Sequence, residues 1–191
     1  MSETERVFDI STRSKRIAAD LMIRSHMKKL DASGAKTFID AVVAACGNEL
    51  KDSLMNTPYA PLTWTQTAEM EQNGMTFAPH TCSHSILSRQ DEAHAAEEIA
   101  QSKEILSQHI RTPLSVFAYP NGSGADYNAT TVSILKRLGF TASLTTESRA
   151  ITTTDSPFAL PRFTLDGATD IHRARLTVRG VYDQLVRTFS A

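Results

Sequence analysis

The sequence predicts an α/β fold in which short strands alternate with helices around a parallel sheet or barrel. From residue 62 onward, short apolar runs alternate with longer stretches whose apolar residues recur at helical spacing, as in repeated βα units. The 191 residues are 41% hydrophobic and 21% charged, which is an ordinary globular composition. A chain of this length can also bury one sizeable core.

The part of the chain before residue 62 predicts two helices and a linker. Apolar residues recur among basic ones over Ser11–Leu30, which favours an amphipathic surface helix. We expect Gly34 to break this pattern and a second helix to run over Ala35–Cys46, with Gly47-Asn48 as its stop. The two prolines of Thr57–Pro61 then favour a linker, because proline restrains the backbone away from helix.

The next segment predicts a capped helix followed by a strand. Thr63 and Gln66 have the spacing of a capping box, so a helix should start at Trp64 and bury that side chain. Gly74 is expected to end it. The apolar run Met75–Ala78 then predicts a short buried strand.

The remaining elements continue the alternation. A long amphipathic helix is expected over Gln90–Ile110, with Pro113 as its stop. Asn128 is expected to cap a helix that Gly139 ends. Strands are expected at Ser115–Tyr119, Phe140–Leu144 and Ala159–Phe163, and a final helix over Val178–Phe189.

Charge and composition exclude several classes of protein. A net charge of -1 gives no reason to expect nucleic acid or an anionic membrane as a partner, and Arg173, Arg175 and Arg179 are expected on a solvated face. Cys46 and Cys82 form no Cys-x-x-Cys pair and are expected to be reduced thiols. Neither a signal peptide nor an apolar span of about 20 residues is visible, so the chain as written is predicted to be soluble and cytoplasmic.

The most informative motif is His80-Thr-Cys-Ser-His84, directly after the predicted strand. Two imidazoles four residues apart can reach one zinc ion if the segment makes a helical turn, and catalytic zinc sites commonly add a carboxylate. Thr81 stands where a zincin protease needs glutamate, which excludes that class. No carboxylate partner is obvious nearby, so two loop histidines with hydrogen-bonded rings are the alternative. Cys82 is expected to be a buried thiol.

A second run, Tyr119-Pro120-Asn121-Gly122, follows the next predicted strand. Loops at the C-terminal ends of parallel strands converge, so this run can share a pocket with the two histidines. A plain turn is the alternative, because proline and Asn-Gly favour turns in any protein.

The histidine motif and its surroundings resemble the polysaccharide deacetylase family, the NodB-like carbohydrate esterases. His80–Ser88 resembles the second motif of that family. The resemblance continues on both sides, in order and at family-like spacing, over most of residues 62–165. The segments that carry it are Leu62–Gln66, Phe117–Gly122, Leu138–Phe140 and Phe158–Arg162.

This resemblance implies a distorted (β/α) barrel that hydrolyses N-acetyl groups of acetylated amino sugars in a glycan. It implies a divalent metal, most often zinc, held by His80, His84 and an aspartate, while a second aspartate activates water. The metal would polarise the acetamide carbonyl and stabilise the oxyanion, with help from the backbone N–H at Asn121. The implied substrate-binding residues are Tyr119, Pro120, Gly122 and Arg162; a structural salt bridge is the alternative for Arg162.

The sequence departs from the family at the first motif, Thr-Phe-Asp-Asp-Gly, which supplies both aspartates and does not occur in the 191 residues. The closest fragment, Val7–Ile10, has one aspartate and precedes a charged helix. Residues 1–61 resemble a helical insert, and residues 62–191 a partial barrel within one structural domain. We therefore expect an incomplete barrel that lacks its first βα unit. An unpaired strand edge would then favour self-association.

These departures weaken the expected activity. Without the two aspartates, zinc should be weakly held, and loss of a general base typically costs on the order of 100- to 10,000-fold in rate. Asp126 and Asp166 are the nearest substitutes by strand-end position. The alternative function is a non-enzymatic remnant that binds glycan or associates with another chain. Surface positions are expected for His94, His109 and His172.

Overall fold

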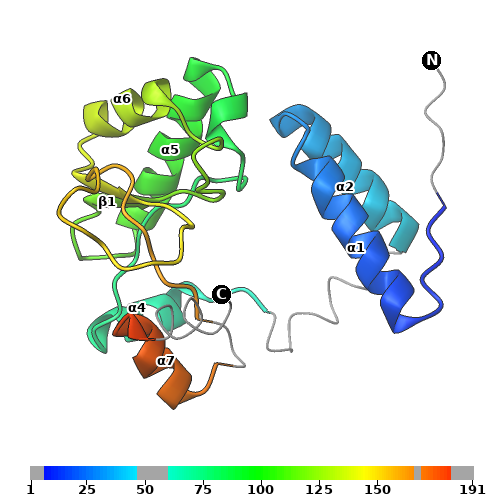
Figure 1. Cartoon of the computed structure of the whole chain (residues 1–191). Helices are drawn as coiled ribbons and strands as arrows, with labels where there is room; N and C mark the ends of the chain where they lie inside the picture. Colours follow the sequence, from blue (N-terminus) through cyan, green and yellow to red (C-terminus); the bar gives the residue numbers. More distant parts are fainter. Residues whose placement is uncertain (1–6, 47–59, 166–168, 182–191) are drawn as a thin grey trace. The chain divides into compact units, whose positions relative to one another are not determined.

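The computed structural model describes residues 7–46, 60–165 and 169–181. Its contacts divide the chain into two compact units, Met1–Ala60 and Pro61–Ala191. Figure 1 shows a pair of helices in the first unit, and helices with short strands in the second.

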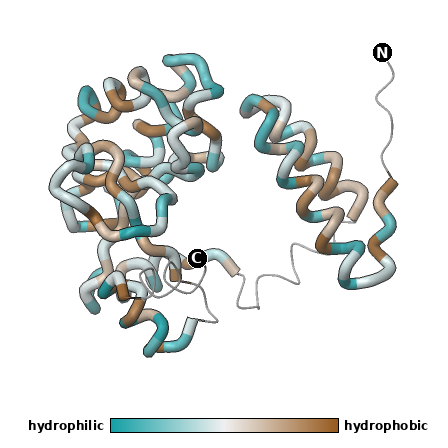
Figure 2. Tube along the Cα trace, viewed as in Figure 1, coloured by the Kyte–Doolittle hydropathy of each residue, from teal (hydrophilic) through white to brown (hydrophobic). Residues whose placement is uncertain are grey.

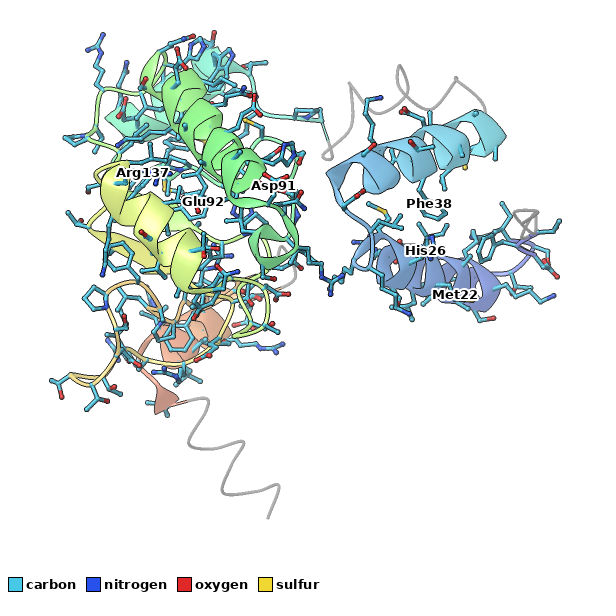
Figure 3. The ribbon with its side chains drawn as sticks, turned by 90° about the horizontal axis from the view of Figure 1, so that it is seen from above. Met22, His26, Phe38, Asp91, Glu92 and Arg137 are labelled. Atoms are coloured by element: carbon cyan, nitrogen blue, oxygen red, sulfur yellow. The ribbon has the colours of Figure 1, made fainter. Side chains whose placement is uncertain are left out.

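The first unit contains two helices that lie side by side, α1 (Arg13–Met27) and α2 (Ala32–Cys46). The Thr12 side chain caps α1 by accepting a backbone N–H of its first turn. The ring of His26 on α1 contacts the ring of Phe38 on α2, with centroids 4.7 Å apart (Figure 3). Hydrophobic residues recur along both helices, as Figure 2 shows. Both predicted helices are therefore confirmed.

The boundary between these helices differs from the prediction. Gly34 lies inside the first turn of α2, so the expected break at this glycine was wrong. The cause is Asp31, whose Oδ1 accepts the N–H of Gly34 at 2.7 Å and starts the helix earlier. The predicted stop at Gly47-Asn48 and most of the predicted linker lie outside the described residues.

The second unit is a parallel α/β arrangement. Its two-stranded sheet pairs β1 (Val116–Ala118) with β2 (Ala142–Leu144) in parallel, in the register Val116↔Ala142 to Ala118↔Leu144. Helix α6 (Ala129–Arg137) connects the strands and packs beside α5 (Glu92–Ser107), as Figure 1 shows, so β1, α6 and β2 form one βαβ unit. The described elements are α4 (Trp64–Gln72), the 3₁₀ turn η1 (Leu87–Arg89), α5 (Glu92–Ser107), β1 (Val116–Ala118), α6 (Ala129–Arg137), β2 (Ala142–Leu144) and α7 (Ile171–Val178).

Two helix starts in this unit follow from local sequence. Thr63 and Gln66 form the predicted capping box at the start of α4, and Asn128 caps α6 in the same way. The prediction that Trp64 is buried was wrong. Its side chain is 46% exposed and stacks on His109 at 3.8 Å, while Thr67 is the buried residue of α4.

Two predicted strands do not form. Met75–Ala78 has no strand pairing, and Met75 is 54% exposed; the chain meets the sheet just afterwards, where Ala118 N–H donates to the Pro79 carbonyl at 3.0 Å. The segment 159–163 contributes a single parallel bridge, Leu144↔Leu160. The first segment therefore reaches the sheet at Pro79, just after its end. The second lies beside β2, where the Leu160 N–H donates to the Ser143 carbonyl and the Thr145 N–H donates to the Leu160 carbonyl, but its pairing does not extend into a regular strand.

The last helix also differs from the prediction. Asp170 caps α7 by accepting the N–H groups of His172 and Arg173, so the helix starts well before Val178. Most of the predicted helix 178–189 lies outside the described residues. His172 is exposed, as predicted. No helix in the parts of the chain that the structure describes is long and apolar enough to cross a membrane.

The core lies between the sheet and helices α5 and α6. Phe117 is fully buried, and its ring contacts the rings of Tyr119 and Phe140, each with centroids 5.6 Å away. Burying one such side chain contributes about 1.5–3 kcal/mol, so this cluster fixes the strands against the helices. At the surface, Arg137 on α6 pairs with Glu92 on α5 at 3.4 Å (Figure 3). The core cluster comprises Leu87, Ala95, Ile99, Phe117, Tyr119, Ile134, Leu135 and Phe140.

Candidate functional site

The two histidines of the motif lie together at the C-terminal end of β1. The His80 Nδ1 donates to the carbonyl of Ala118, the last residue of β1, at 2.7 Å. The rings of His80 and His84 meet edge to face, with centroids 4.9 Å apart. Because Nδ1 carries the proton in this bond, the lone pair of Nε2 is free to bind a metal.

The loop between the histidines is not the helical turn that the sequence analysis required. Thr81 and His84 both adopt positive φ angles, 63° and 59°. Such angles are uncommon outside glycine, and strained backbone of this kind costs of order 1–3 kcal/mol per residue. The backbone N–H groups of Cys82 and Ser83 both donate to the carboxylate Oε2 of Glu98 on α5, each at 2.9 Å. A buried side chain thus holds the middle of this loop.

The charge state of His80 suits a metal ligand. Burial lowers its pKa below the ordinary value of 6.5; the bond to Ala118 opposes this, and the charges of His84 and Arg162 lower it further. The neutral imidazole, which is the form that binds metal, is therefore favoured. Cys82 is exposed, so the expectation of a buried thiol was wrong. Partial desolvation and nearby carboxylates raise the pKa of this thiol, which keeps it protonated at neutral pH.

The run after β1 lies between the two strand ends. Tyr119 is fully buried in the core and its hydroxyl donates to the Phe158 carbonyl at 3.2 Å, so only its backbone faces the site. Pro120 is buried and Asn121 half-buried. Gly122 lies close to the backbone that follows β2: a Cβ at this position would lie 2.5 Å from the backbone nitrogen of Thr146.

Arg162 joins the site from the segment 159–163, which pairs with β2 at Leu160. Its Nη2 donates to the Tyr119 carbonyl at 3.1 Å, one residue beyond the carbonyl that His80 uses. Its own backbone N–H donates to the Glu147 carbonyl at 3.0 Å. Burial lowers the pKa of this guanidinium, which nevertheless stays protonated at neutral pH. The structure therefore brings Arg162 and His80 together on successive carbonyls of one strand end.

Among the described residues of the second unit, no carboxylate joins the two histidines as a third metal ligand. Within residues 7–46, 60–165 and 169–181, no three His, Cys, Asp or Glu side chains form a group that could hold a metal. The Asp126 carboxylate accepts from Ser123 in its own turn. Asp9 in the first unit binds Lys15, which lowers its pKa to about 2. Asp166 lies outside the described residues. The donor set thus fits two of the ligands of a zinc site.

Sequence reasoning missed Glu98, the residue that touches the histidine loop from α5. It stands beside Glu97 in a charged helix, a pattern typical of a solvated face. The available signal was its helical position: Glu98 lies three residues after Ala95 and four before Ser102, and all three are buried.

Comparisons with known proteins identify relatives of this chain. The model of the family described as polysaccharide deacetylase matches residues 24–143. The putative polysaccharide deacetylase YxkH of Bacillus subtilis is 29% identical over 101 residues, which are 53% of this chain and 35% of YxkH. The Streptococcus pyogenes deacetylase PplD, solved in complex with acetate, is 28% identical with a TM-score of 0.54, over 64% of this chain and 53% of that chain.

A second solved structure supports the fold alone. IcaB from Ammonifex degensii is 24% identical with a TM-score of 0.50, over 64% of this chain and 54% of that chain. The chain therefore spans about half the length of the solved chains that it matches, and about a third of YxkH.

Proposed function

This chain belongs to the polysaccharide deacetylase family, and from that premise we propose that it hydrolyses N-acetyl groups on acetylated amino sugars of a glycan with the help of a divalent metal. The single observation that carries the proposal is the pair of facing imidazoles, His80 and His84, at the C-terminal end of β1. Active sites of parallel α/β folds gather at this end of their strands.

His80 and His84 would be two of the protein ligands. The bond from His80 Nδ1 to the Ala118 carbonyl leaves Nε2 available, as metal-binding histidines commonly do. Imidazole suits zinc, which is the metal we propose. When bound, the ion would polarise the acetamide carbonyl and make water more acidic. Burial lowers the pKa of His80, which supports this role, since the ring must be neutral to bind metal.

Substrate contacts would come from the run after β1 and from Arg162. The backbone N–H at Asn121 would donate to the oxyanion that forms on the acetamide carbonyl, because preorganised donors there stabilise the transition state. Arg162 would orient substrate oxygen atoms with its remaining guanidinium N–H groups. The Tyr119 backbone, Pro120 and Gly122 would form the floor beneath the sugar.

The described residues supply neither a catalytic base nor a third metal ligand beside the two histidines. We propose that these 191 residues hold zinc weakly and are weakly active or inactive alone, as an incomplete (β/α) barrel. Support comes from the described residues, where no third metal-binding side chain groups with the two histidines. The same observation favours a second candidate function, a module that binds glycan or associates with another chain without catalysis.

Zinc titration by calorimetry on the metal-free chain tests the proposal. We expect one-to-one binding in the wild type, a loss of about tenfold or more in affinity for His84→Ala, and no change for His172→Ala, an exposed histidine of α7. Equal binding by all three proteins would refute the metal site. Acetate release from an acetylated amino-sugar oligomer with zinc present then separates a deacetylase from a non-catalytic module, for which no release is expected.

A further inference from the structure

Glu98 is a carboxylate buried beneath the histidine loop. It is 7% exposed, whereas the neighbouring Glu97 side chain is 59% exposed. Its Oε2 accepts the N–H groups of both Cys82 and Ser83 at 2.9 Å. A carboxylate is seldom buried without partners, because burial of an unpaired charge is costly. The two loop N–H groups are such partners, so the burial of Glu98 and the shape of the loop depend on each other.

The loop depends on this contact because its backbone is strained. Thr81 and His84, on either side of the two bound N–H groups, have positive φ angles. Non-glycine residues keep such angles only where their surroundings enforce them. A carboxylate accepting two consecutive N–H groups enforces the turn between them, in charge-assisted hydrogen bonds that are stronger than neutral ones.

The two histidines differ in how they are fixed. His80 is held through its own ring, by the carbonyl of Ala118. The His84 ring forms no hydrogen bond with another residue that the structure describes, so its position follows from the loop backbone. The nearest restraint on that backbone is the contact of Cys82 and Ser83 with Glu98.

We propose that Glu98 is a positioning residue for the two histidines: its carboxylate fixes the loop so that the His84 ring faces the His80 ring. The inference rests on the proposed metal site for its functional meaning. Glu98 touches neither metal nor substrate in this scheme. It acts through the backbone between the two ligands. An ordinary surface glutamate of α5 would face solvent and have no such effect.

The test compares Glu98→Ala and Glu98→Gln with Glu104→Ala, a matched change at an exposed glutamate of the same helix. Amide hydrogen exchange at Cys82 and Ser83, measured by NMR, reports the loop. Zinc titration reports the ligand geometry, and the denaturation midpoint reports stability. Glu98→Gln keeps a carbonyl oxygen that can accept both N–H groups, so it is the conservative variant.

We expect Glu98→Ala to speed exchange at both amides and to weaken zinc binding by about 10- to 100-fold, as removal of a supporting residue around a metal does. Glu98→Gln should recover most of both losses, and Glu104→Ala should match the wild type. Wild-type zinc affinity in Glu98→Ala would overturn the proposal, whatever happens to stability. If the wild type itself binds no zinc, the proposed metal site fails, and exchange alone decides: unchanged protection of both amides in Glu98→Ala overturns the role of Glu98.

Discussion

Replacement of Gly122 by alanine should destabilise the second unit by pushing apart the ends of its two strands. A Cβ at this position would lie 2.5 Å from the Thr146 nitrogen and 2.8 Å from two backbone atoms of Thr145. Ordinary contacts begin at 3.4 Å, so backbone must move by about 0.9 Å to admit the methyl group. The obstacle is main chain, and no side-chain rotation can relieve it.

The expected cost follows from two effects. Overpacking of this kind costs about 1–3 kcal/mol. The displacement also strains the two hydrogen bonds between Gly122 and Thr146, both 3.3 Å long, which contribute about 0.5–1.5 kcal/mol each. Alanine also restricts the unfolded backbone more than glycine does, and this offsets about 0.4–1 kcal/mol of the loss in stability. The net loss in free energy of unfolding should therefore be about 1–6 kcal/mol.

Urea denaturation followed by tryptophan fluorescence measures this loss, because Trp64 is the single tryptophan and lies in the second unit. Gly124→Ala is the matched control: a Cβ there meets nothing within 4 Å, and the glycine does not have a positive φ. That variant should be unchanged or slightly stabilised. If Gly122→Ala proved as stable as Gly124→Ala, the argument from close backbone approach would be wrong.

Two further predictions concern the core. Burial is the main cause that raises the pKa of Tyr119 to about 12, whereas an unfolded phenol ionises near pH 10. The unfolded chain therefore loses this proton first, so stability should fall as pH rises from about 10 to about 12. Ultraviolet titration should show a phenol that ionises near pH 12, and Tyr119→Phe should remove it. An equally steep loss of stability in that variant would contradict the assignment. Ile99→Ala should lose about 2–5 kcal/mol in denaturation, because Ile99 is 0% exposed. The same change at Ile105, 45% exposed on the same helix, should cost far less.

Features set by neighbouring residues were predictable from the sequence. The capping box of Thr63 and Gln66 and the cap at Asn128 need only residues three apart, and both helices start where predicted. The parallel strands β1 and β2 were also expected, because buried apolar runs flank a helical pattern between them.

Features set by distant partners were not predictable in the same way. Met75–Ala78 has the composition of a strand, but an apolar run becomes a strand only if a neighbouring segment pairs along it. Trp64 stacks on His109, 45 positions away along the chain, and this contact leaves no signal at either residue alone. Cys82 was expected to be buried from its residue type, whereas the turn held by Glu98 leaves its thiol exposed.

The candidate site follows the same division. The spacing of His80 and His84 identified the pair, and the structure brings their rings together. The loop geometry that achieves this depends on Glu98, whose contacts span 15 and 16 positions in the sequence. Arg162 was recognised through a family-like motif, but its attachment to the Tyr119 carbonyl is a contact that only the fold reveals.

The side chains of His80 and Arg162 bind two successive carbonyls at the end of β1, and these two bonds should form late when the chain folds. His80 reaches 38 positions along the chain to Ala118, and Arg162 reaches 43 positions to Tyr119. Contacts that close such long loops form slowly, since chain entropy must be lost before they contribute stability. The histidine and the arginine should therefore acquire their native positions only after β1 has docked, late in folding. A refolding chain would regain most of its helical signal before His80 bonded to Ala118 and Arg162 bonded to Tyr119.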